Sequence, residues 1–122
     1  MGQDEAHSGS VTTLEENLKK AMTEMILLHL LSKRESYIGE LTEAIVQKSG
    51  GKLRIVFPYS AIYRLLDGGN IYEKEKRFAP DGRRRQYYAV TDQGREYLAR
   101  LMHTYSVFTQ GLTDLLAQEG TE

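Results

Sequence analysis

An abrupt change of hydrophobic period at residues 70–91 limits the fold of this chain more than any other feature of its sequence. Aromatic and β-branched residues alternate with polar ones over 70–78 and again over 84–91, a pattern typical of half-buried strands. The two runs flank Ala-Pro-Asp-Gly, where proline fixes φ and Gly82 can adopt a positive φ. The sequence therefore predicts a β-hairpin in this segment.

Helical periods precede and follow the hairpin. Thr13 and Glu16 fit a capping box that opens a first helix, which should run to about residue 33 or 34 with a buried second half. Ser36 can cap a second helix through about residue 48, and a third helix is expected over 57–67. Thr91 and Asp92 can cap a last helix with a leucine-rich stripe.

The order of these elements predicts an α+β fold that is mostly α. Three helices, a two-stranded β wing and a further helix form the order of a winged helix-turn-helix, in which the third helix enters a groove of DNA. We expect this domain over residues 12–91 and a C-terminal dimerisation helix over 92–118. The segments 1–11 and 119–122 are expected to be disordered tails.

Length and composition restrict the class of protein. A chain of 122 residues suits one small domain, and the absence of cysteine excludes disulfides and a cysteine nucleophile. The longest apolar run, over 25–31, is far shorter than the roughly 20 residues that span a bilayer. We therefore expect a cytoplasmic protein.

Positive charge is concentrated in the middle of the chain. Residues 52–88 contain nine basic and four acidic side chains, a local net charge of +5, whereas the formal net charge of the whole chain is -1. A basic segment between acidic helices indicates a polyanion-binding face, although a solvated charged surface would give the same count.

The third helix and the hairpin carry the predicted DNA contacts. Tyr59 is expected to share the inward side of the third helix with Ile62, Leu65 and Leu66, and Ser60 and Arg64 to lie on the outward face. An arginine there could reach a guanine edge or a phosphate. Alternation places Lys74 and Lys76 on one face of the hairpin. The predicted DNA-binding residues are Phe57, Tyr59, Ser60, Tyr63, Arg64, Lys74, Lys76, Arg83, Arg84 and Arg85.

The tyrosines that follow these arginines have a different predicted role. Tyr87 and Tyr88 are neighbours in a strand, so they face opposite ways and one of them should point inward. We expect them to anchor the wing to the core, the alternative being that one stacks on a nucleic-acid base.

The chain resembles the PadR family of bacterial transcriptional regulators. The resemblance covers about residues 20–118 and rests on Arg85-Gln-Tyr-Tyr-Ala-Val-Thr91-Asp-Gln-Gly94, preceded by Tyr59-Ser-Ala-Ile-Tyr-Arg-Leu-Leu-Asp-Gly-Gly69-Asn-Ile71. Its most specific part is the tyrosine pair with the threonine and the glycine that follow it. It implies a winged helix-turn-helix homodimer that represses a nearby gene until a small molecule binds. Val56-Phe57-Pro58 departs from the family's Pro-Gly-Thr type turn, so the family's polar contacts at that helix start do not transfer.

The last helix is too apolar for a small monomer to cover, so pairing with a second copy is expected, with packing on its own domain as the alternative. A dimer would bind a palindromic site. Met and aromatic residues of this helix and of the first helix could line a pocket for an aromatic or apolar effector, or be plain core. The dimerisation stripe is Leu98, Leu101, Tyr105, Phe108, Leu112 and Leu115, and the pocket candidates are Met22, Met25, Tyr97 and Met102.

No pattern in the sequence predicts catalysis. The three histidines, His7, His29 and His103, have no metal-ligand spacing. No serine lies in a nucleophile-elbow motif and no glycine pair belongs to a phosphate loop. We therefore expect no catalytic residue, no metal and no cofactor. The competing function is a winged-helix protein-interaction module without sequence-specific DNA binding, and membrane association is not expected.

Overall fold

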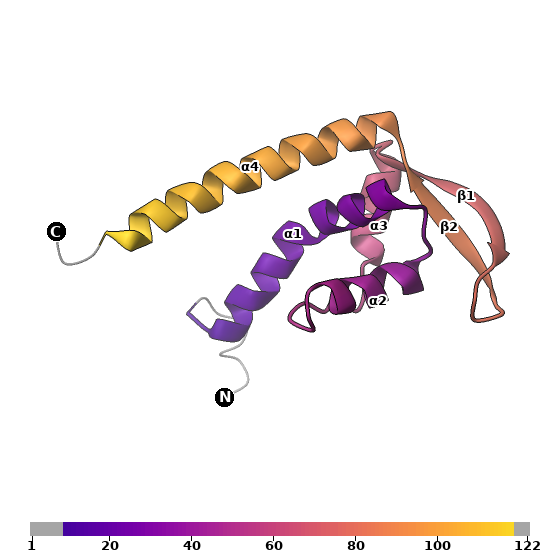
Figure 1. The fold of residues 1–122 in the computed structure, drawn as a ribbon, viewed down its shortest axis with the longest axis horizontal. Helices are drawn as coiled ribbons and strands as arrows, with labels where there is room; N and C mark the ends of the chain where they lie inside the picture. Colours follow the sequence, from indigo (N-terminus) through magenta and orange to yellow (C-terminus); the bar gives the residue numbers. More distant parts are fainter. Residues whose placement is uncertain (1–8, 119–122) are drawn as a thin grey trace.

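The computed structural model describes residues 9–118, so the predicted tail at 119–122 and residues 1–8 of the predicted tail at 1–11 lie outside the described residues. Within that range the elements follow in the predicted order (Figure 1): α1 (Val11–Lys33), α2 (Ile38–Lys48), α3 (Tyr59–Asp67), β1 (Ile71–Phe78), β2 (Arg84–Val90) and α4 (Asp92–Ala117). The predicted sequence of three helices, a hairpin and a last helix is confirmed.

Helix α1 begins earlier than predicted because Ser10, not Thr13, is its N-cap. The hydroxyl oxygen of Ser10 accepts a hydrogen bond from the backbone N–H of Thr13 at 2.9 Å. Glu16 pairs with Lys19 at 3.6 Å. Serine and threonine both cap helices well, so residue type alone does not decide between them. The predicted tail boundary at residue 11 was therefore wrong, since Val11 is already helical.

The link between α1 and α2 contacts the hairpin. Ser36, predicted to cap α2, instead forms an antiparallel bridge with Tyr88 of β2. The N–H of Ser36 donates to the carbonyl oxygen of Tyr88 at 3.2 Å, and the N–H of Tyr88 donates back at 2.9 Å. Tyr37 takes the N-cap position, and its backbone N–H donates to the carboxylate of Glu40 at 3.3 Å. The base of the wing is thereby attached to the helical part of the domain.

The hairpin is antiparallel, with Ile71 opposite Val90 and Phe78 opposite Arg84. At the turn, Gly82 has φ of +84° and its N–H donates to the carbonyl oxygen of Ala79 at 2.9 Å. The pairing register shifts between residues 73 and 76, which marks a bulge in β1. A bulge interrupts strict alternation of side chains, and this affects the lysines of the wing.

The hydrophobic core forms where the second half of α1 meets α2, α3, the base of the hairpin and the start of α4. Burial of these aliphatic side chains is the main driving force that holds the elements together. The fully buried residues with the largest side chains are Leu27, Leu28, Leu41, Ile62, Leu65, Ile71 and Pro58.

The start of α4 is fixed to the turn that follows α3. Thr91 caps α4 by accepting from the N–H of Gly94 at 2.9 Å, and its hydroxyl donates to the carbonyl oxygen of Gly69 at 2.7 Å. The side-chain amide of Gln93 donates to the carbonyl oxygen of Gly68 at 2.8 Å. Gly94 is buried so closely that an added Cβ would overlap the carbonyl oxygen of Asn70. The predicted cap at Thr91 is confirmed.

Helix α4 passes beside α1 and then continues away from the domain (Figure 1). Leu98 and Leu101 pack against the core, whereas the apolar residues from Met102 to Leu116 are largely exposed. None of the helices within residues 9–118 is long and apolar enough to cross a bilayer.

Candidate nucleic-acid interface

Helix α3 presents a polar and aromatic outer face. Its buried side consists of Ala61, Ile62 and Leu65, while Ser60, Tyr63 and Arg64 are exposed. Tyr59 was predicted to face inward but is 48 % exposed. Viewed along the helix axis, Ala61, Leu65 and Ile62 occupy one buried sector, and Tyr59 lies next to Ile62 at the edge of that sector.

Arg64 is held by a carboxylate of α1. Its Nε lies 2.5 Å from Oε2 of Glu24, and the hydroxyl of Tyr97 in α4 donates to Oε1 of the same carboxylate at 3.0 Å. Burial, and then this hydrogen bond, raises the pKa of Tyr97 above its ordinary value. The outward position of Arg64 was predicted, but its partner was not, because the two residues are 40 positions apart in the sequence.

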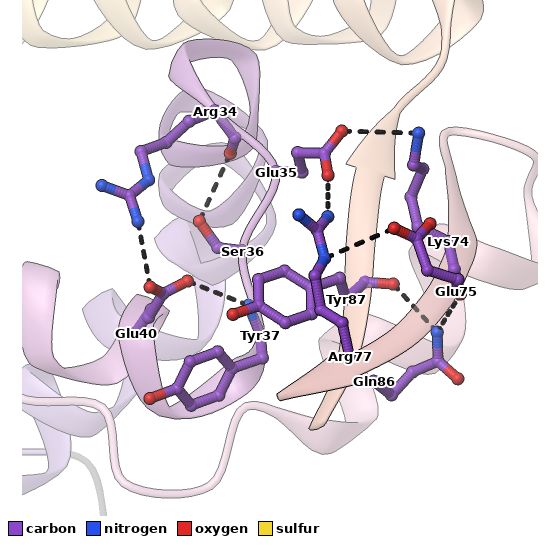
Figure 2. A network of polar contacts seen from close by, with 10 residues as sticks. All are labelled: Arg34, Glu35, Ser36, Tyr37, Glu40, Lys74, Glu75, Arg77, Gln86 and Tyr87. Carbon is purple, nitrogen blue, oxygen red and sulfur yellow. Dashed lines mark hydrogen bonds and ion pairs between the residues drawn. The ribbon is translucent and has the colours of Figure 1, made fainter. Parts of the chain in front are cut away.

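A polar network joins the wing to the α1–α2 link (Figure 2). Glu35 accepts from Arg77 and also pairs with Lys74, whose Nζ lies 3.5 Å from Oε2. Because of the bulge in β1, Lys74 and Arg77 reach the same carboxylate, while Lys76 is exposed and has no ion pair among the described residues. The prediction that Lys74 and Lys76 act from one face rested on strict alternation, which the bulge interrupts.

Both tyrosines of the wing are buried. Tyr88 packs in the core, and Tyr87 is covered by the guanidinium of Arg77, 3.9 Å from its ring centroid, and by the edge of Tyr37 at 5.4 Å (Figure 2). An arginine over a tyrosine ring is a favourable cation–π contact. Only one tyrosine was expected to point inward, because nothing in the sequence shows that Arg77 and Tyr37 cover the second face. Neither ring is free to stack on a base.

The tip of the wing contains one bound and two free arginines. The guanidinium of Arg85 donates to the Asp81 carboxylate at 2.7 Å, and the backbone N–H of Arg83 donates to the other oxygen at 3.0 Å. These hydrogen bonds, that of Arg85 first, hold the pKa of Asp81 below its ordinary value. The side chains of Arg83 and Arg84 are exposed and unpaired within residues 9–118.

Two further cations lie in the link before α3. Lys52 and Arg54 are exposed, and neither has an ion pair in the described part of the chain. Both residues belong to the basic segment 52–88, but neither was among the predicted DNA contacts. Cations without an internal partner are the ones available to neutralise phosphates. Within the basic segment 52–88, the cations that have no ion pair are Lys52, Arg54, Lys76, Arg83 and Arg84.

The start of α3 also exposes an apolar ring. Phe57 is 79 % exposed, although the next residue, Pro58, is fully buried. The groove beside Phe57 is bordered by Lys20 of α1 and by Ser60 and Arg64 of α3. The exposed ring therefore lies among polar and cationic side chains.

The predicted effector residues are only partly brought together. Met25 and Met102 line an apolar groove of about 440 Å³ between α1, α2 and α4, which also includes Ile26 and Leu53. Met22 and Tyr97 do not line this groove. Tyr97 instead points its hydroxyl at Glu24.

These features define a winged helix-turn-helix: a helix with an outward polar face, a cationic β wing beside it and a long helix that leaves the domain. A model of the PadR-like family of transcriptional regulators matches residues 27–100, which is more than half of the chain. The chain belongs to this family and is a DNA-binding transcriptional regulator.

Solved structures share the fold over nearly their whole length. A transcriptional regulator from Clostridium thermocellum superposes with a TM-score of 0.71 at 24% identity, covering 84% of this chain and 99% of that one. A PadR-like regulator from Bacillus cereus gives 0.70 at 23%, with coverages of 84% and 99%. A PadR family regulator from Eggerthella lenta gives 0.74 at 22%, with coverages of 89% and 94%. Comparison with curated proteins gives no match.

Proposed function

We propose that this regulator binds a palindromic DNA site as a homodimer and represses the gene beside it. The observation that carries the proposal is the apolar stripe of α4, where Tyr105, Phe108, Leu112 and Leu115 are exposed. An exposed stripe of this length favours pairing with an identical helix. Two-fold pairing places two recognition helices symmetrically, which favours half-sites about one helical turn apart. Leu98 is left out of the proposed stripe because it is buried in its own domain.

In the proposed complex the two DNA-facing elements have different roles. Helix α3 contacts base edges through Ser60, Tyr63 and Arg64, because residues on its outer face are those that reach into the major groove. The unpaired cations of the wing and of the link before α3 contact phosphates and contribute sequence-independent affinity. Arg85 is not assigned a phosphate contact, because Asp81 holds a terminal nitrogen of its guanidinium, whereas Glu24 holds Arg64 through Nε and leaves its terminal nitrogens available.

A small aromatic or apolar molecule is the proposed effector. The groove that contains Met25 and Met102 supports this, since methionine side chains adapt to varied apolar ligands and this groove borders both α1 and α4. A panel of aromatic compounds can be screened by thermal unfolding, followed by transcription in vitro with and without each compound that stabilises the protein. Repression that no stabilising compound relieves would contradict the effector part of the proposal.

The central experiment measures fluorescence anisotropy with duplex DNA from upstream of the protein's own gene and with a scrambled duplex of equal length. Both are titrated at two salt concentrations, and the mass of the complex is determined by sedimentation. The expected result is tighter, salt-sensitive binding of two chains to the native duplex. Absence of binding to either duplex at low salt would instead favour a protein-interaction module.

A further inference from the structure

The orientation of Phe57 is set by buried residues on both sides of it. Ile55 is 9 % exposed and Pro58 is fully buried, so the backbone of the segment before α3 is anchored at two points. Val56 and Phe57 lie between these anchors and are exposed to solvent. The phenylalanine ring is therefore held outward at the N-terminal end of the recognition helix, where it packs against little of its own chain.

The surroundings of this ring indicate what covers it. Lys20, Ser60 and Arg64 border the groove at Phe57, and the free cations Lys52 and Arg54 precede it in the chain. Charged residues are depleted at the centre of protein–protein interfaces, whereas they surround the contact points of proteins on DNA. The ring thus faces a polyanion that also has an apolar group.

In the major groove that apolar group is the C5-methyl of thymine, which phenylalanine side chains contact. Residues at the N-terminal end of a recognition helix are the ones that reach base edges. We propose that Phe57 reads a thymine methyl group in each half-site, so that this regulator selects a thymine where a polar helix start would select by hydrogen bonds. The inference rests on the proposed DNA binding and adds a specificity residue and its target group to it.

The test removes the methyl group without changing base pairing. A preferred duplex is first selected from random sequence, and each thymine is then replaced by deoxyuridine at the symmetric position of both half-sites. For the wild-type protein one position is expected to lose about four-fold in affinity per half-site, the fold-change for burial of a methyl-sized group. Phe57→Ala is expected to bind the thymine and deoxyuridine duplexes equally.

Phe78→Ala is the matched control. Phe78 is also a highly exposed phenylalanine, at 74 %, but it lies at the end of β1 near the turn of the wing. Its substitution is expected to leave the response to the thymine methyl unchanged. Phe57→Ser is a second variant in which the same loss of response is expected, and circular dichroism checks that each variant is folded.

The outcomes separate the inference from the proposed function. If wild-type protein binds the selected duplex specifically but no deoxyuridine position matters, or if Phe57→Ala or Phe57→Ser keeps the wild-type response, the role of Phe57 is overturned while DNA binding stands. If wild-type protein shows no preference for any selected sequence, the proposed operator binding fails, and the inference fails with it.

Discussion

At the scale of single residues, Glu24 connects three helices. Its carboxylate, on α1, accepts from Arg64 of α3 and from Tyr97 of α4. The arginine side chain is about half exposed, so the ion pair itself contributes at most about 1 kcal/mol to stability. In the proposed complex we expect its larger effect to be on DNA contact, because a guanidinium held in one direction has less freedom to bind phosphates at random.

Glu24→Gln tests this role. The amide keeps an acceptor for the Tyr97 hydroxyl but removes the charge that holds Arg64. Affinity for a scrambled duplex is expected to rise more than affinity for the operator, with a salt slope steeper by roughly one per protomer. Glu96→Gln removes an exposed carboxylate from α4 without touching Arg64 and serves as the control. Unchanged binding to both duplexes would show that Glu24 does not orient Arg64.

At the scale of secondary-structure elements, the arginines of the wing differ in whether they have an acidic partner: Arg85 is paired with Asp81, and Arg84 is unpaired within residues 9–118. Arg84→Ala is expected to weaken binding to every duplex about equally and to lower the salt slope by about 0.9 per protomer, or about 1.8 for the dimer, since each protomer loses one phosphate contact. Arg85→Ala is expected to leave the salt slope close to the wild-type value, because Asp81 neutralises that guanidinium. Titrations at several salt concentrations measure both slopes. An equal decrease for the two variants would mean that the Asp81–Arg85 pair opens on DNA.

The junction of α4 with the turn after α3 requires glycine at position 94, because there is no room for a Cβ atom there. Gly94→Ala would push a Cβ against the backbone oxygen of Asn70, and overpacking of this kind is expected to cost about 3 kcal/mol. Gly111→Ala, also in α4, has nothing within 4 Å of its Cβ and should change stability by about 1 kcal/mol or less. Urea unfolding measures both. A Gly94 variant as stable as the Gly111 variant would show that the junction can relax.

The elements were predictable from the sequence because their signals are local. Period, capping residues and the turn around Gly82 all act within a few positions, and the predicted hairpin and the cap at Thr91 are confirmed. Where two residues are equally good N-caps, the sequence did not identify the right one: Thr13 was predicted to cap α1, but Ser10 does so. The partners Glu24 and Glu35 lie 40 and 42 positions from their arginines, so they become visible only in the folded chain.

At the scale of the whole molecule, the proposed dimer can be tested with a single charge. Phe108→Glu places a carboxylate in the exposed stripe of α4, at a side chain that is 67 % exposed. The variant is expected to sediment as a monomer and to bind the operator at least about 100-fold more weakly, because bivalent attachment is lost. Ser106→Glu adds the same charge off the stripe and should leave both properties unchanged. A dimeric Phe108→Glu protein would contradict pairing through this face.

The junction at Thr91 and Gly94 fixes one end of α4, so that the helix can act as a lever arm. A helix of 26 residues is about 39 Å long, and its near end is joined to the carbonyl groups of Gly68 and Gly69, which follow α3. Over that length, a displacement of a few ångströms at the far end corresponds to only a small rotation at the near end. A rigid α4 would therefore turn a coarse movement at its C-terminal end into a fine rotation at the turn that follows α3.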